Sequence, residues 1–287
     1  MPFKYSELIF VAGGRDNTYN FCKSLSFDNF VKVITLKQNP DDFKAGALIK
    51  GIKHAKGDYI ILIDADTLVA SNLVLEIVKS LEKSDAVNCD YYPMLQKGFW
   101  YNFYIINKLI WAKNYTNLSN LFGGATISMK KSLINEIGVE KLFTDLSTAG
   151  VDYYLSLVLK KFNKRLGFVK NARLITPRPN NIKDFSKDHS RWFDAFFQIH
   201  QADIRFVIRT LILNTLYSLV PLFLLFLNIA KIRKITHKKY KKVKYLFILF
   251  LVDYLRTILR IKACIKLLAH RIKSLNHFKG SRYLTIL

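Results

Sequence analysis

Short apolar runs alternate with segments of helical periodicity through the first part of the chain. The apolar runs predict strands over Glu7–Ala12, Phe30–Leu36 and Tyr59–Ile63. Apolar residues at helical spacing predict helices over Phe43–Ala55 and Leu73–Leu81. Such alternation is typical of an α/β domain in which helices cover both faces of a mostly parallel sheet.

The alternation continues further along the chain. Ala86–Tyr92 predicts another strand, and Gly123–Met129 predicts a glycine turn that enters a strand. Lys131–Ile137 and Asp152–Lys160 predict helices, the second with a carboxylate in its first turn, where the helix dipole favours it. Gly98–Lys113 is rich in aromatic residues, which fits either core packing or a surface that contacts lipid headgroups.

The longest apolar run lies in the last third of the chain. Thr210–Ile229 is nearly all apolar and has about the length of a membrane-spanning helix, although Pro221 interrupts it. A dense cluster of lysine and arginine follows over 231–244, as in cytoplasmic loops. Beyond Val252, basic residues intrude among leucines and isoleucines, which predicts a basic amphipathic helix lying in a membrane interface.

Composition supports a division of the chain. Its 287 residues are 51% apolar, yet the formal net charge is +24. Because these two properties occupy different segments, we predict a globular domain over 1–203 and a membrane-associated helical region over 204–287. The charge implies an anionic partner. Since the basic residues lie beside apolar runs and not in a nucleic-acid-binding motif, we expect anionic lipid and no nucleic acid.

Two carboxylates follow the strand predicted at Tyr59–Ile63. Asp64 and Asp66 lie two residues apart at the edge where α/β sheets bind ligands. Carboxylates at this edge suit a divalent cation that also holds phosphate oxygens. A bare Asp-x-Asp pair is usually a solvated turn, but the strand before it and the helix after it favour a metal site. The turn over 13–18 falls at the same edge.

Taken in order, these segments resemble glycosyltransferase family 2, the inverting enzymes of Rossmann-like GT-A fold that use nucleotide sugars. The resemblance covers roughly residues 5–200. Arg191-Trp192 resembles the end of the Gln-x-x-Arg-Trp motif of lipid-linked and processive members, including ceramide glucosyltransferases. The remaining motifs are Gly13–Thr18, the Phe-Lys-Ala-Gly-Ala-Leu segment 43–48, Lys56–Asp66, Gly123–Leu133, Val151-Asp152 and the segment Phe162–Ala172 that follows.

The chain also departs from the family pattern. The family's opening strand, ending in Pro-x-Tyr-Asn-Glu, has no counterpart, so we expect a sheet one strand short or a sequence that begins downstream of the true start. Asp188 stands at the glutamine of the acceptor motif, and Val151 replaces the acid beside Asp152. His189 would either contact the acceptor or be merely exposed, and we favour exposure.

The resemblance implies a role for each matching residue on the donor side. Asp66 would bind a divalent metal, Mg or Mn, and Asp64 would share in metal binding or contact the ribose. Lys44 would add positive charge near the nucleotide, or would be an ordinary exposed helix lysine. The glycine turn, with Gly13, Gly14 and Asp16, would line the donor pocket.

The acceptor side involves other residues. Asp152 would be the catalytic base for an inverting transfer, because a carboxylate at that helix start can accept the proton of a hydroxyl. Arg191 would hold phosphate oxygens and Trp192 would offer a stacking face, with Gly123 and Gly124 lining the same subsite.

We therefore predict a membrane-associated inverting glycosyltransferase that moves a sugar from a nucleotide-diphosphate donor to a hydroxyl of a lipid or lipid-linked glycan. The alternatives are a polyprenyl-phosphate glycosyltransferase and a catalytically degenerate relative that binds acidic lipid. We expect the cell membrane as its location, with the catalytic domain facing the cytoplasm. A re-entrant hairpin at Pro221 or a monotopic anchor would keep the basic loop on that same side.

Overall fold

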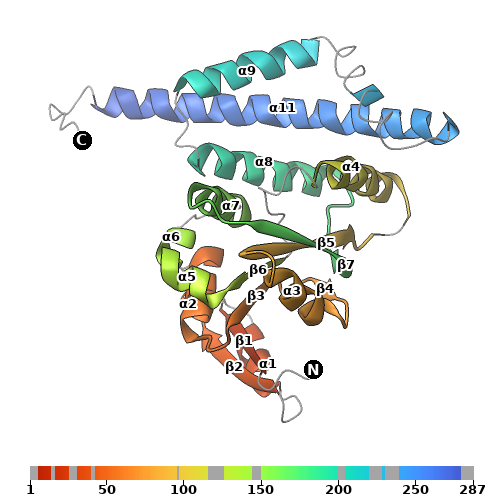
Figure 1. Ribbon diagram of the computed structural model, residues 1–287. Helices are drawn as coiled ribbons and strands as arrows, with labels where there is room; N and C mark the ends of the chain where they lie inside the picture. The colour runs from red at the N-terminus through yellow and green to blue at the C-terminus, as the bar shows by residue number, and fades with distance from the viewer. Residues whose placement is uncertain are drawn as a thin grey trace. The chain divides into compact units, whose positions relative to one another are not determined.

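The computed structural model describes residues 6–13, 17–25, 31–39, 43–95, 97–115, 126–143, 150–199, 204–219, 228–229 and 239–278 (Figure 1). The chain divides into two compact units. The first unit comprises Met1–Met94 and Ala112–Arg178, and the second unit comprises Leu95–Trp111 and Pro179–Leu287. The two-domain division at residue 203 stays a prediction.

The first unit contains the strands and helices expected from the sequence. The structure confirms β3, α3 and α5 with the expected bounds and the other predicted elements to within a few residues, whereas β4, α6 and β7 were not predicted. In chain order the elements are β1 (Ser6–Ala12), α1 (Thr18–Ser24), β2 (Val31–Lys37), α2 (Phe43–His54), β3 (Tyr59–Ile63), β4 (Leu68–Val69), α3 (Leu73–Leu81), β5 (Ala86–Pro93), β6 (Thr126–Lys130), α5 (Lys131–Ile137), α6 (Val139–Leu142), α7 (Val151–Lys161) and β7 (Leu166–Thr176).

The strands form two sheets, and the expected mostly parallel sheet is wrong. β1 and β2 form a parallel pair, whereas the other strands form a five-stranded sheet of order β3-β6-β5-β7-β4. In the larger sheet only β5 and β7 pair in parallel, because β6 runs antiparallel to both of its neighbours and β4 runs antiparallel to β7. Apolar periodicity reports which side of a strand is buried and not the direction of its partner, so the sequence pattern could not reveal this mixture.

Both faces of the five-stranded sheet are covered. Residues that alternate along β3 and β6, among them Ile60, Ile127 and Met129, pack with α2, α5, α6 and α7. On the opposite face, α3 buries its apolar side against β5 and β7. This alternation at period two is what a sheet between two helical layers requires.

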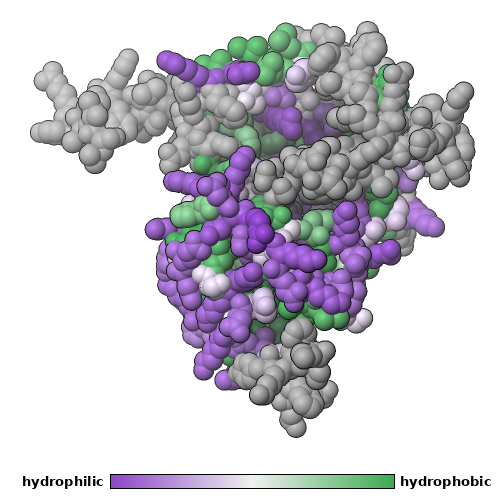
Figure 2. Space-filling model, viewed as in Figure 1, coloured by the Kyte–Doolittle hydropathy of each residue, from purple (hydrophilic) through white to green (hydrophobic). Residues whose placement is uncertain are grey.

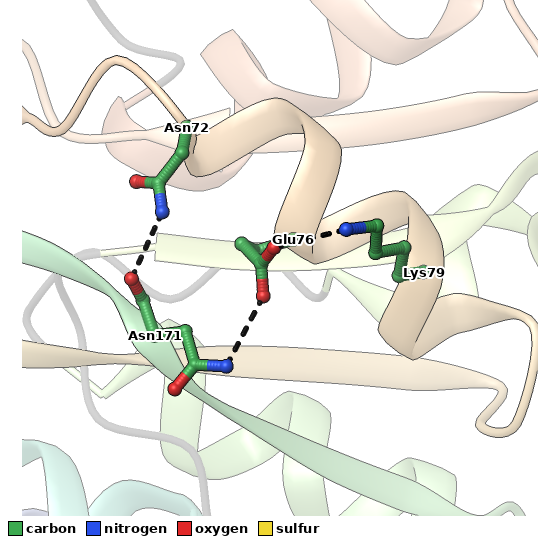
Figure 3. A network of polar contacts seen from close by, with 4 residues as sticks. All are labelled: Asn72, Glu76, Lys79 and Asn171. Carbon is green, nitrogen blue, oxygen red and sulfur yellow. Dashed lines mark hydrogen bonds and ion pairs between the residues drawn. The ribbon is translucent and has the colours of Figure 1, made fainter. Parts of the chain in front are cut away.

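A chain of polar contacts ties α3 to β7 (Figure 3). The side-chain amide of Asn72 donates to the carbonyl oxygen of Asn171 (3.0 Å), and the amide of Asn171 donates to the Glu76 carboxylate (3.4 Å). Lys79 pairs with the other oxygen of Glu76 at 3.3 Å. These contacts complement the apolar packing of α3 and fix where the helix lies along the sheet.

The second unit is helical. α8 (Ile182–Ile199) and α9 (Ile204–Leu219) both pack against the long helix α11 (Lys239–Phe278), and most of α4 (Phe99–Tyr115) belongs to the same unit. Phe103 of α4 and Phe185 of α8 share a buried cluster with the Ile248–Leu259 segment of α11. The aromatic residues of Gly98–Lys113 therefore contribute at least in part to a core, which was one of the two readings of that segment.

Within this cluster lies a largely buried arginine. The guanidinium of Arg256 lies 4.9 Å from the ring centroid of Phe103, pairs with Asp253 at 3.3 Å and donates from Nε to Nε2 of His189 at 3.2 Å. The His189 ring also stacks on Phe185, with centroids 3.8 Å apart. The expectation that His189 is exposed is wrong, because Arg256 and Phe185 hold its ring partly buried.

In the described ranges, no helix combines the length and the apolar character needed to cross a membrane. Of the apolar run Thr210–Ile229, the part up to Leu219 belongs to α9, and most of the rest lies outside the described residues. The basic cluster 231–244 likewise lies outside them as far as residue 238.

The packing of α3 gives a test of the first unit. Ile77 is fully buried between α3 and the sheet, whereas Leu75 on the same helix is 42% exposed. Ile77→Ala should lower the free energy of unfolding by about 2–4 kcal/mol because it leaves a cavity. Leu75→Ala should change it by less than about 0.5 kcal/mol. Urea unfolding of both variants would measure the difference, and equal losses would contradict this packing.

Candidate functional site

The Asp-x-Asp pair lies at the carboxyl end of β3. The strand ends at Ile63, and a turn follows in which the backbone N–H of Thr67 donates to the carbonyl oxygen of Asp64 at 3.0 Å. The Thr126 hydroxyl of β6 donates to the carbonyl oxygen of Leu62 at 2.8 Å and fixes the last residues of the strand. Asp66 is exposed and Asp64 is half-buried.

Lys44 reaches this turn from the first turn of α2. Its Nζ lies 2.5 Å from Oδ1 of Asp64, and the two side chains are 51% and 35% exposed. At such exposure solvent screens the pair, so its contribution to stability is small. Its effect is local, because it holds one carboxylate oxygen of Asp64 beside a positive charge. The sequence predicted Lys44 either as a positive charge near the nucleotide or as an exposed helix lysine, and it did not predict the ion pair with Asp64.

Asp152 is the buried acid of the site. It occupies the first turn of α7, two residues after the N-cap residue Gly150, whose φ of 101° lies in the left-handed region that favours glycine. Its side chain is buried, and Oδ2 has no hydrogen-bond partner among the residues that the structure describes. A buried carboxylate oxygen without a partner is costly, so this group is poised to accept a proton or a hydrogen bond.

Electrostatics connects Asp152 with the other two residues. Burial raises the pKa of the Asp152 carboxyl group, while the backbone N–H of Tyr153 and the charge of Lys44 lower it and the charge of Asp64 raises it. Geometry agrees with this coupling, because Ala45 and Val151, the chain neighbours of Lys44 and Asp152, belong to one buried cluster and Lys44 pairs with Asp64. These residues are distant in sequence, yet all belong to the first unit.

The structure describes only part of the predicted donor turn. Gly13 lies directly after β1, and a Cβ there would approach the Cβ of Gln38 to 2.6 Å and its carbonyl oxygen to 3.0 Å. Glycine is therefore required for the close approach of this turn to the end of β2. Gly14 and Asp16 of the same turn, and Gly123 and Gly124 of the acceptor subsite, lie outside the described residues.

The predicted acceptor residues Arg191 and Trp192 lie on α8, in the second unit. The guanidinium of Arg191 pairs with Asp188 at 2.8 Å, and the Trp192 side chain is exposed. Their roles stay predictions.

Thr67, which was not predicted as a site residue, is a further candidate because it directly follows Asp66. Its hydroxyl oxygen is buried without a hydrogen-bond partner in the described part of the chain. A hydroxyl directly after Asp66 can donate to a phosphate or sugar oxygen. The only signal available from the sequence was its position after the Asp-x-Asp pair.

The described residues contain no group of three or more His, Cys, Asp or Glu side chains that could hold a metal ion. Mg²⁺ is commonly bound by one or two carboxylates together with substrate phosphates and water, without a complete protein cage. The exposed Asp66 carboxylate with Asp64 beside it fits such an open site, although Lys44 occupies one oxygen of Asp64.

The buried acid gives a prediction about stability. Because folding raises the pKa of Asp152 above its ordinary value of 3.8, the folded state holds the proton more tightly than the unfolded state, and stability falls as pH rises between the two pKa values. Asp152→Asn should therefore be more stable than the wild type at neutral pH, with a difference that vanishes below pH 3.8. Thermal unfolding over a pH series would measure this.

Asp58→Asn provides the matched control, because it removes a carboxylate that is exposed. This control should show no such pH-dependent gain. An Asp152→Asn variant that is less stable than the wild type at neutral pH would mean that the buried carboxylate is stabilised by contacts that outweigh its desolvation.

The comparisons with known proteins address the first unit. Residues 2–136 match the model of glycosyl transferase family 2, over slightly less than half of the 287 residues. A search of curated proteins found no match. The matched segment contains Lys44, Asp64 and Asp66, whereas Asp152 lies beyond its end. Residues 2–136 are therefore similar to glycosyl transferase family 2.

Proposed function

We propose that the protein is a membrane-associated inverting glycosyltransferase that moves a sugar from a nucleotide-diphosphate donor to a hydroxyl of a lipid or lipid-linked glycan. The observation that carries the proposal is the buried Asp152 carboxyl group, whose pKa responds to the charges of Lys44 and Asp64. A buried acid beside a charged edge of a sheet is an arrangement typical of catalytic sites. The family match over 2–136 supports the reaction class.

On the donor side, Asp66 and Asp64 are the proposed ligands of a divalent cation, Mg or Mn. Such a cation would stabilise the charge of the departing nucleoside diphosphate. Lys44 adds a positive charge to the same edge and keeps the Asp64 carboxylate turned toward α2. The Thr67 hydroxyl would gain a hydrogen-bond partner when a donor oxygen approaches it.

On the acceptor side, Asp152 is the proposed base. A raised pKa makes its carboxylate a stronger proton acceptor than an exposed aspartate. Its Oδ2, which has no partner among the residues that the structure describes, is the atom that would take the proton of the acceptor hydroxyl. Inversion requires that the hydroxyl attack the sugar on the face opposite the leaving diphosphate. Arg191 and Trp192 remain proposed contacts for the acceptor.

We also propose that the second unit attaches the enzyme to a membrane with anionic lipids, at the cytoplasmic side of the cell membrane. Its support is the large positive charge of the chain and the exposed apolar side chains of the second unit, among them Ile212 and Phe247. A lipid-linked acceptor would then diffuse within the plane of the membrane to which the enzyme is bound.

The proposed metal site gives the first activity test. Asp66→Asn should abolish metal-dependent release of nucleoside diphosphate, because it removes a charged ligand without removing any core packing. Asp64→Asn should be damaging to a smaller extent. Asp58→Asn, the exposed aspartate before β3, should keep near-normal activity. The assay is a screen of nucleotide-sugar donors with membranes and Mg²⁺ or Mn²⁺, and near-normal turnover of Asp66→Asn would remove Asp66 from the site.

The proposed base gives a second test. Asp152→Asn should lower kcat by about 100- to 10,000-fold while the Kd of the donor stays within about twofold, because a base acts in the transition state. Donor titration and single-turnover kinetics would separate the two effects. A variant that transfers sugar efficiently to a polyprenyl phosphate would instead favour that acceptor, since an anionic acceptor needs no strong base.

A further inference from the structure

Helix α9 exposes its more apolar side. Its exposed positions are 205, 208, 209, 212, 213 and 216, which recur at intervals of three and four residues and so form one face. We call this the α9 face; it consists of Arg205, Ile208, Arg209, Ile212, Leu213 and Leu216.

This arrangement is the reverse of that in an ordinary surface helix. On the side turned toward the rest of the second unit, α9 buries Asn214 as well as Val207. Of the six α9 positions that the structure describes as exposed, four are isoleucine or leucine. Figure 2 shows apolar residues gathered at the surface over α9, at the top of the view. Contiguous apolar surface of this kind marks an interaction site in a soluble or peripheral protein.

Charge indicates what this site binds. The two charged members of the α9 face are Arg205 and Arg209, both near its N-terminal end, and α9 contains no acidic residue. A guanidinium group binds phosphate oxygens bidentately, and its aliphatic stem can lie along apolar surface while the charge stays in water. Apolar side chains with arginines at one end match the boundary between acyl chains and phosphate headgroups.

A second copy of this chain is a poorer occupant. Each copy carries a formal net charge of +24, so two copies approaching one another would repel. An anionic bilayer is attracted by the same charge. The helix α11, against which α9 packs, adds further exposed apolar residues to the second unit, including Phe247, Leu251 and Ile258.

We infer that the α9 face is the bilayer-contacting surface of the second unit, with Ile208, Ile212, Leu213 and Leu216 in the acyl boundary and Arg205 and Arg209 on the anionic headgroups. The inference rests on the membrane association in the proposed function and gives it a defined surface. It is independent of the sugar-transfer chemistry, so either can fail without the other.

The first experiment measures partition of the full-length chain onto vesicles of phosphatidylcholine, with and without phosphatidylglycerol. The Ile208→Ser/Ile212→Ser variant should bind both kinds of vesicle at least about tenfold more weakly than the wild type. Its matched control is Val74→Ser/Leu75→Ser on α3, since the exposed fractions are 42% and 54% for the α9 pair and 43% and 42% for the control pair. The control should partition like the wild type.

Substitution of the arginines separates the charge contribution. Arg205→Gln/Arg209→Gln should weaken binding to phosphatidylglycerol vesicles by about 30-fold at low salt, and the difference should shrink at high salt. Binding to pure phosphatidylcholine should stay the same within about twofold. An equal loss on both kinds of vesicle would overturn the headgroup assignment.

A labelled variant guards against loss of folding in the serine variants. Cys22, Cys89 and Cys264 are all buried, so Ile212→Cys offers an accessible thiol for an environment-sensitive fluorophore. Its emission should shift to the blue on vesicles and be quenched by brominated acyl chains, whereas a label at Leu75→Cys should do neither. Absence of the shift in vesicle-bound protein would overturn the inference.

Two further readouts make the outcomes distinct. Sedimentation without lipid would reveal a second copy as the occupant if the wild type is a dimer and Ile208→Ser/Ile212→Ser is a monomer, and this too would overturn the inference. Donor titration of the same proteins reports on the first unit. If Ile208→Ser/Ile212→Ser loses vesicle binding but keeps its affinity for the donor, the result supports the α9 face as the bilayer-contacting surface. If the wild type and all variants fail to bind the donor while the wild type still binds vesicles, the result counts against the proposed function alone.

Discussion

Burial of the Asp152 carboxyl group is the constraint on which the candidate site depends. A carboxyl group in low dielectric loses the hydration that stabilises its charge, and Oδ2 of Asp152 has no hydrogen-bond partner in the described part of the chain to replace the lost water. The first turn of α7 reduces this cost, because the backbone N–H of Tyr153 and the positive end of the helix dipole favour the carboxylate. A ligand that donates a hydrogen bond to this oxygen would offset the remaining free-energy cost of burying it.

The rest of the first unit determines which charges face that carboxyl group. Strand β6 lies between β3 and β5 and ties down the end of β3, so that Asp64 emerges at a fixed place. Helix α2 packs on the same face of the sheet as α7, and its first turn presents Lys44 to Asp64. The ion pair is too exposed to stabilise the fold much. Its consequence is electrostatic, because it places the positive charge of Lys44 beside the negative charge of Asp64.

The second unit buries most of a charged side chain, the guanidinium group of Arg256. A core that contains Arg256 must neutralise and solvate its guanidinium group, and the structure does this with the Asp253 carboxylate, the His189 ring and two aromatic faces. These contacts join α4, α8 and α11. With several large apolar side chains exposed beside arginines, the unit has the character expected of a surface that meets lipid.

The sequence by itself determined most elements of the first unit and the presence of a carboxylate pair at the end of β3. Apolar periodicity located β3, α3 and α5, since burial on one side of a strand or helix leaves its period in the chain. It also identified Asp64 and Asp66, because a carboxylate pair after a buried strand is a local pattern. Only the tertiary structure decided that β6 runs antiparallel between its neighbours, that Lys44 pairs with Asp64, and that His189 is held by Arg256. These are contacts between segments distant in the sequence, and a local pattern of polarity records whether a side chain is buried without recording what it is buried against.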